Sequence, residues 1–91
     1  MPVDAQADIL TAEKLNEKDV RDTKVTSMNF EGPYSVLIEF SNGIVARLHP
    51  ADDHWMSFVG EKVLELSHSD LGKFSFLRIR FQSGKVGLFK A

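Results

Sequence analysis

The chain has 91 residues, enough for one domain that buries roughly 60 to 65% of the surface its unfolded form exposes. Apolar residues make up 43% of it and the net charge is −2, which is typical of a globular protein and excludes a disordered one. The absence of cysteine excludes disulfides, thiolate metal ligands and a cysteine nucleophile. No signal-peptide pattern or membrane-length apolar run is present. We therefore expect a cytoplasmic protein without a membrane partner.

Charge is distributed unevenly along the chain. Residues 1–31 contain seven acidic and four basic side chains, whereas residues 71–91 contain five basic side chains and no acidic one. The two ends therefore differ in sign. This asymmetry favours association with a charged partner or with a second copy of the chain.

The first twenty residues are polar and lack aromatic side chains. Their few apolar residues recur at roughly helical spacing, which predicts a short helix over residues 12–18; a frayed terminus is the alternative. We therefore assign residues 1–20 to an N-terminal tail or short helix. Residues 21–91 are assigned to a single antiparallel β domain.

From residue 25 the pattern changes to the alternation typical of strands. Residues 25–30 predict one strand, which ends before Pro33 because proline has no N–H for a sheet ladder. Residues 36–48 predict a β-hairpin that turns at Asn42-Gly43, the pair favoured in a two-residue type I′ turn.

A two-residue turn at Asn42-Gly43 sets the register of this first hairpin. It opposes Phe40 to Val45 and Ile38 to Arg47. The alternation then separates a polar face from a core face. The predicted core face consists of Tyr34, Val36, Ile38, Phe40 and Val45.

A second hairpin of similar sequence turns at Ser83-Gly84. Residues 38–46 and 79–87 share isoleucine, phenylalanine, glycine and valine at matching positions, through duplication or because both hairpins meet the same demands of turn and pleat. Two hairpins plus the strand over residues 25–30 predict an antiparallel sheet. With one or two short helices added, the expected fold is α+β and mainly β.

The stretch between the hairpins predicts a short helix and a further strand. Residues 51–59 fit a helix that packs Trp55, Phe58 and Val59 inward, with Gly60 after its end. Residues 62–66 fit a short strand, and residues 67–70 resemble a turn.

Candidate catalytic and metal-binding residues are few. His49, Asp52, Asp53 and His54 are of the types that bind zinc or iron, but their spacing matches no zinc signature, and a capped helix start explains them better. His68 and the nearby Asp70 supply only part of a two-histidine, one-carboxylate iron site. No serine lies in a nucleophile elbow, and no phosphate-binding loop is present. The sequence therefore favours a protein that is not an enzyme and needs no cofactor.

The second hairpin carries the more informative surface. A two-residue turn there opposes Phe81 to Val86 and Ile79 to Leu88, which predicts that the other face carries Phe74, Phe76, Arg78, Arg80 and Phe89. Aromatics interleaved with arginines stack nucleic-acid bases, but they are also the residues of protein interfaces. The alternative is that the rings pack in the core and the arginines pair with Glu39 and Glu65.

The acidic overall charge favours a protein partner over nucleic acid. The leading hypothesis is a non-enzymatic interaction module that binds a protein or a second copy through sheet edges and the second hairpin. Nucleic-acid binding by this hairpin, and a small metal-dependent enzyme built on the histidine and aspartate cluster, are the alternatives. The predicted partner-binding residues are Arg78, Arg80, Lys85, Phe76 and Phe89.

The alternating run over residues 34–43, followed by a strand, an aspartate-containing loop and Phe74-x-x-Leu77-Arg78-Ile79, resembles a family of small bacterial domains of unknown function. Members of that family occur alone or joined to helix-turn-helix modules. The resemblance covers residues 23–89. It implies a small domain and no established activity.

Overall fold

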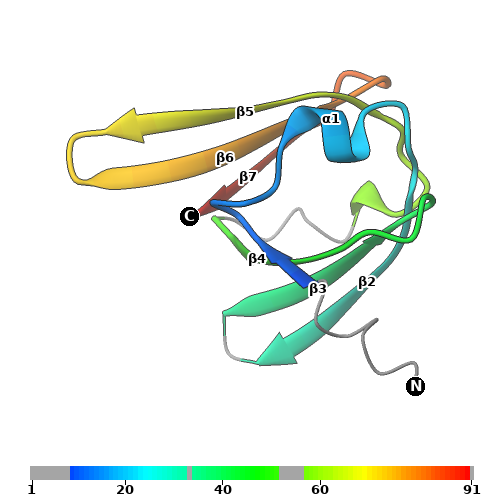
Figure 1. Cartoon of the computed structure of the whole chain (residues 1–91), viewed down its shortest axis with the longest axis horizontal. Coiled ribbons are helices and arrows are strands. Elements are labelled where there is room, and N and C mark those ends of the chain that lie inside the picture. The colour runs from blue at the N-terminus through cyan, green and yellow to red at the C-terminus, as the bar shows by residue number, and fades with distance from the viewer. Residues whose placement is uncertain (1–8, 33, 52–56, 91) are drawn as a thin grey trace.

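The computed structural model describes residues 9–32, 34–51 and 57–90. The described chain is mostly strand, which confirms the expected mainly β class, and it contains one short helix. Figure 1 shows the arrangement of these elements. They are β1 (Ile9–Thr11), α1 (Glu17–Val20), β2 (Val25–Gly32), β3 (Ser35–Phe40), β4 (Val45–Pro50), β5 (Val63–Leu71), β6 (Phe74–Phe81) and β7 (Val86–Lys90).

The strands form one sheet in the order β2-β3-β4-β7-β6-β5, and β1 pairs in parallel with β4 outside this path. The neighbouring strands of the path are antiparallel. The sheet curls until its two outer strands meet at one end, where Lys24 bridges Lys62. The N–H of Val63 donates to the carbonyl of Thr23 at 2.8 Å, and the N–H of Val25 donates to that of Glu61 at 3.0 Å. The predicted sheet is therefore closed on itself at this end.

Alternation along the strands builds a single core inside the curled sheet. Phe58 stacks on Phe81 with ring centroids 4.8 Å apart and meets Phe89 edge-on at 6.4 Å. Burying one such ring stabilises the fold by roughly 1.5 to 3 kcal/mol. The largest fully buried side chains are Phe40, Phe81, Phe89, Leu15, Ile38, Leu48, Leu77, Ile79, Val20, Val25, Val36 and Val63.

The turn of the first hairpin is longer than the predicted two-residue turn. The N–H of Gly43 donates to the carbonyl of Phe40 at 3.0 Å, and the N–H of Phe40 donates to that of Ile44 at 2.9 Å. Gly43 has φ +92°, whereas Asn42 is not among the residues with positive φ. These features define a three-residue loop that ends in a glycine bulge. The predicted type I′ turn is therefore wrong.

The extra loop residue shifts the register by one and changes the faces of β4. Glu39 now opposes Val45, and Ile38 opposes Ala46. Because side chains alternate along a strand, a slip of one residue exchanges the two faces. Ala46 and Leu48 are therefore fully buried, whereas Val45 is only half-buried. Tyr34 is 80% exposed for a different reason, because it lies in the turn before β3. The predicted core positions of Val45 and Tyr34 are wrong.

The second hairpin uses the same loop and shows the same slip. The N–H of Gly84, at φ +100°, donates to the carbonyl of Phe81, and the N–H of Phe81 donates to that of Lys85. The register therefore opposes Ile79 to Gly87, which corrects the predicted pairs of this hairpin. Phe89 consequently lies in the core, only 1% exposed, instead of beside the arginines.

The N-terminal segment belongs to the same core from Ile9 onward. Of the residues predicted as a helix over 12–18, residues 12–14 form a turn after β1 and only the last two belong to the helix, which spans Glu17–Val20. Its start is set by Asn16, whose N–H donates to the Asp19 carboxylate at 3.0 Å as in a capping box. Leu15 and Val20 are fully buried.

Predictions for the stretch between the hairpins have mixed outcomes. Residues 52–56, including Trp55, lie outside the described residues. Phe58 is buried as expected, but Val59 is 50% exposed. The strand predicted over residues 62–66 continues to Leu71, so the turn predicted over residues 67–70 is wrong. The chain reverses later, at Gly72, where φ is +67°.

Candidate functional site

Four of the five predicted partner-binding residues are exposed or half-buried, but only three of them share a face. Phe76, Arg78 and Arg80 occupy alternate positions of β6 and point outward. Lys85 lies in the turn, where its ammonium contacts Glu61 at 3.4 Å and the Ser57 carbonyl at 3.1 Å. Phe89 is in the core. The structure therefore separates Lys85 and Phe89 from the other three.

Strand pairing adds β7 residues to this outer surface. Val86 lies opposite Arg80, Leu88 opposite Arg78 and Lys90 opposite Phe76. These β7 residues were missed in the sequence because the predicted register placed them on the other face. We call the outward residues of the two strands the basic aromatic face: Phe74, Phe76, Arg78, Arg80, Val86, Leu88 and Lys90.

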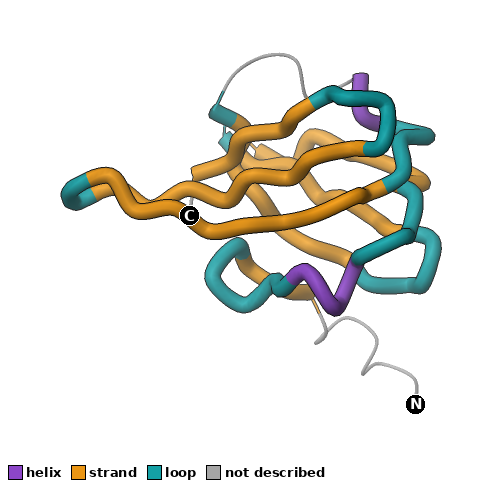
Figure 2. Tube along the Cα trace, turned by 90° about the horizontal axis from the view of Figure 1, so that it is seen from above, coloured by secondary structure: helices purple, strands orange, loops and turns teal. Residues whose placement is uncertain are grey.

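The basic aromatic face extends onto a projection of the molecule. Figures 1 and 2 show the hairpin of β5 and β6 reaching beyond the rest of the sheet in two perpendicular views. We call the part of this hairpin that lies beyond the last β7 pair, residues 70–75, the arm. The last paired residue of β7, Lys90, lies opposite Phe76, so Phe74 and Ser75 have β5 as their only neighbouring strand among the described residues. The ring of Phe74 is 64% exposed.

Positive charge dominates the basic aromatic face. Arg80 contacts Glu65 on the neighbouring strand at 3.4 Å. Glu65 is one of the two glutamates that the sequence suggested as partners of the arginines. Arg78 and Lys90 form no ion pair with any described residue. The nearby Asp70 accepts a hydrogen bond from Ser75 at 2.7 Å. This face therefore combines two cations that have no ion-pair partner among the described residues with exposed apolar side chains.

A hollow of about 180 Å³ lies where the basic aromatic face reaches the arm. Two lysines and two phenylalanines from β6, the preceding turn and β7 surround it. The hollow is smaller than the roughly 300 to 1,000 Å³ of small-molecule sites, so it fits a single side chain better than a cofactor. It is lined by Lys73, Phe74, Ser75, Phe76 and Lys90.

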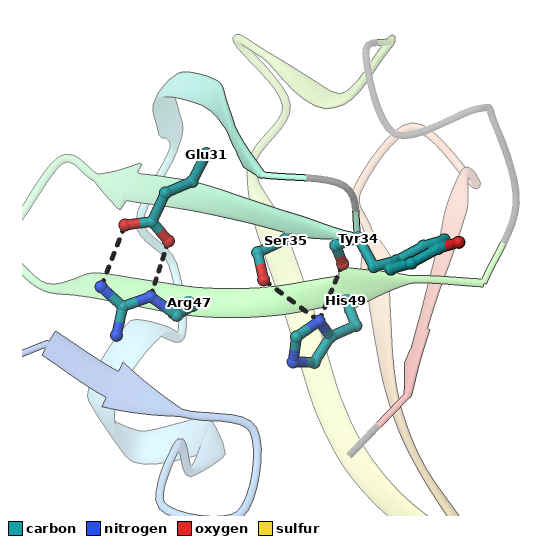
Figure 3. Close-up of polar contacts among 5 residues, drawn as sticks. All are labelled: Glu31, Tyr34, Ser35, Arg47 and His49. Carbon is teal, nitrogen blue, oxygen red and sulfur yellow. Dashed lines mark hydrogen bonds and ion pairs between the residues drawn. The ribbon is translucent and has the colours of Figure 1, made fainter.

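A second polar cluster lies on β2, β3 and β4 (Figure 3). The Arg47 guanidinium donates to both carboxylate oxygens of Glu31, at 2.6 and 3.0 Å. The hydrogen bond from Arg47, helped by its charge, holds the pKa of the Glu31 carboxyl below its usual 4.5. The sequence did not reveal this pair, because its partners meet only through the pairing of three strands. The bidentate contact leaves the Arg47 charge neutralised.

His49, next to this ion pair, is held in one tautomer. Its Nδ1 lies 2.7 Å from the Tyr34 carbonyl oxygen and 3.3 Å from the Ser35 hydroxyl (Figure 3). A carbonyl only accepts, so Nδ1 carries the proton. A second hollow, of about 200 Å³, is lined by Thr11, Ala12, Glu13, Arg47 and His49.

No three histidine, aspartate or glutamate side chains come together as a metal site within the described residues. Of the cluster considered from the sequence, Asp52, Asp53 and His54 lie outside those residues. His68 uses its Nε2 to contact the Ala12 carbonyl at 2.9 Å. The described residues therefore do not bring His49 and His68 together in a metal site.

Comparison of the chain with known protein families, curated proteins and solved structures finds no match. Within the described residues, no helix is both long enough and apolar enough to cross a membrane. Function is therefore inferred from the geometry and charge of the exposed surfaces.

Proposed function

We propose that this protein is a non-enzymatic interaction module that binds a protein partner through the basic aromatic face. The observation that carries the proposal is the 64% exposure of Phe74 on a projecting arm, on the same face as Arg78, which forms no ion pair with any described residue. Folding gains nothing from leaving a large ring in water, because the hydrophobic effect rewards its burial. Phe30 and Tyr34 are similarly exposed, at 63% and 80%, but Phe74 also shares its face with the exposed Val86 and Leu88 and with Arg78. Contact with a partner accounts for this combination.

The rest of the face supports a protein partner. Val86 and Leu88 are 42% and 39% exposed beside the arginines. Contiguous exposed apolar groups mark interaction sites, and aromatic residues and arginine are the types that most often dominate binding energy at protein interfaces. Four strand positions on β6 and three on β7 present these groups on a rigid sheet.

Capture from a cell lysate tests the proposal. Immobilised wild-type protein is compared with Phe74→Glu/Arg78→Glu, and captured proteins are identified by mass spectrometry. The matched control is Tyr34→Glu/Arg21→Glu, which places the same two changes on exposed residues elsewhere. We expect one captured protein that the face variant loses and the control retains.

Two results contradict the proposal. One is a partner captured equally by the wild type and the face variant. The other is the absence of any captured protein together with a monomer in light scattering, which also removes association between copies. Circular dichroism of each variant verifies that the sheet is intact, so a loss of capture reports on the surface.

Nucleic-acid binding is the second candidate, and the spacing on β6 favours it. Phe74, Phe76 and Arg78 alternate on one face, which suits base stacking beside a phosphate contact. The net charge of −2 weakens this candidate, because phosphate contacts supply most of the affinity for nucleic acid. Anisotropy of a labelled oligothymidine at low and high salt tests it. Absence of binding at low salt removes it.

A further inference from the structure

We propose that the hollow on the arm seats a carboxylate side chain of an extended acidic segment in the partner. This inference rests on the proposed function and specifies the partner's chemistry. Lys73 and Lys90 approach the hollow from different elements, the turn before β6 and the end of β7. Neither ammonium forms an ion pair with a described residue.

The lining of the hollow fits a carboxylate on an aliphatic stem. Phe74 and Phe76 provide apolar contact for methylene groups, while the lysine ammoniums supply rotatable donors for the two oxygens. The hydroxyl of Ser75 is already donated to Asp70 at 2.7 Å, so the lysines are the cationic donors left in the hollow. The small volume argues against a nucleotide base.

Cations continue from the hollow along β6 at a regular interval. Phe76 lies opposite Lys90, and Arg78 is two residues farther along the strand. Two residues of a strand span about 6.6 Å, the same interval at which an extended peptide points successive side chains to one side. A partner segment with acidic residues at every second position therefore places one carboxylate in the hollow and the next at Arg78.

A second copy of the chain fits this surface less well. Pairing two copies through their basic aromatic faces would oppose Arg78 and Lys90 of one copy to the same residues of the other. Like charges brought together in this way disfavour the complex. Charge complementarity therefore favours an acidic segment of another protein.

The test measures fluorescence anisotropy with labelled peptides. The probe is a short capped peptide in which glutamates alternate with leucine and phenylalanine. One control peptide has glutamine in place of glutamate, and another contains the same residues with the glutamates contiguous. We expect the alternating acidic probe to bind about tenfold more tightly than either control, with the difference shrinking as salt rises.

Matched variants locate the site. Lys73→Gln/Lys90→Gln should abolish the roughly tenfold preference, because it removes both ammoniums from the hollow. Lys14→Gln/Lys24→Gln removes the same charge from exposed lysines outside the hollow and should leave affinity within about twofold. Amide chemical shifts of Phe74 and Phe76 should move on titration with the probe.

Three outcomes overturn the inference. The first is equal affinity for the alternating and the contiguous peptide. The second is an equal loss of affinity for the alternating peptide in both lysine variants. The third is tighter binding of an oligothymidine than of the alternating peptide, with dependence on the same two lysines. If capture of a protein still depends on Phe74 and Arg78 while the probes show no preference, this inference fails and the proposed function stands. If that capture fails as well, both are wrong.

Discussion

The hairpins of β3–β4 and β6–β7 have the same loop and share two of their inward residues, yet their outer surfaces differ. Ile38 and Phe40 in the first correspond to Ile79 and Phe81 in the second, and all four are buried. Both loops end in a glycine with positive φ. On the outside, Arg47 of the first hairpin is held by Glu31, whereas Arg78 of the second has no ion-pair partner in the part of the chain that the structure describes.

This contrast distinguishes the inward residues, which the core requires, from the outward residues, which the fold does not constrain in the same way. The inner positions are alike because both hairpins close the same core. In the first hairpin, the edge of β4 pairs with β1, and the outward Arg47 is bound to Glu31. The second hairpin carries its cations and rings onto the projecting arm (Figure 1). This difference supports the proposal that a partner binds the second hairpin and not the first.

The largest expected effect comes from removing the equivalent core rings. Phe40→Ala and Phe81→Ala should each lower the free energy of unfolding by about 3 to 5 kcal/mol, because each leaves a cavity in a packed core. Urea denaturation measures the loss. Phe74→Ala, on the exposed face, should change stability by at most about 0.5 kcal/mol. A loss of unfolding free energy below about 0.5 kcal/mol for either buried ring would show that the two hairpins do not contribute equivalent rings to the core.

Ala46 and Gly87 occupy equivalent positions that are not interchangeable. A Cβ on Gly87 would lie 2.9 Å from Phe58 Cε2 and 3.0 Å from Phe89 Cε2. Those rings are packed in the core and cannot both move away, so Gly87→Ala should destabilise the fold by about 1 to 3 kcal/mol. Thermal unfolding measures this loss. Unchanged stability would show that the aromatic cluster is loosely packed.

The two loop glycines should be equally sensitive. Gly43→Ala and Gly84→Ala place a side chain at φ +92° and +100°, where no neighbouring atom interferes but the backbone itself is strained. Each should cost about 1 to 2 kcal/mol. Parallel urea titrations of the two variants provide the measurement. A large difference between them would mean that one loop relaxes to another turn.

The smallest effect concerns acid. Arg47 lowers the folded-state pKa of Glu31 below 4.5, so the unfolded chain binds this proton more readily. The pair therefore contributes stability above the unfolded pKa and loses it as the pH falls through the folded pKa. Melting temperatures of wild type and Glu31→Gln should differ slightly at neutral pH and converge in acid. A difference that persists in acid would contradict this contribution.

A comparable carboxylate supports the second hairpin. A hydrogen bond from Ser83, with a further contribution from Lys85, lowers the pKa of Glu61. Glu61 therefore also stabilises the fold at neutral pH, and this stabilisation is lost as the pH falls. Acid therefore weakens both hairpins and does not distinguish them.

Local pattern was sufficient for most of the strands and for their first inward residues, but it missed β1 and the second half of β5. Ile38, Phe40, Ile79 and Phe81 alternate with polar neighbours, and alternation depends on the strand alone. The closure of the sheet by Lys24 and Lys62 could not be predicted in this way, because it joins segments far apart in the sequence.

The register depended on contacts that the sequence does not display. The side-chain amide of Asn42 donates to the Asp19 carbonyl at 2.6 Å, and its oxygen accepts from the Ile44 N–H at 3.1 Å. These bonds accompany the three-residue loop in place of the two-residue turn favoured by Asn-Gly. The same slip in the second hairpin took Phe89 from the candidate site into the core. Most of the strands were therefore predictable, whereas the site was only partly so.

The closed sheet also has a consequence for how the chain reaches its native state. The hairpins can form early from residues close in sequence, but β1 must find β4, and β4 must find β7, after most of the chain is available. Proteins dominated by such distant pairings fold slowly, on the order of milliseconds to seconds. Final docking of these strands, after the turns have formed, is therefore the step expected to limit the folding rate.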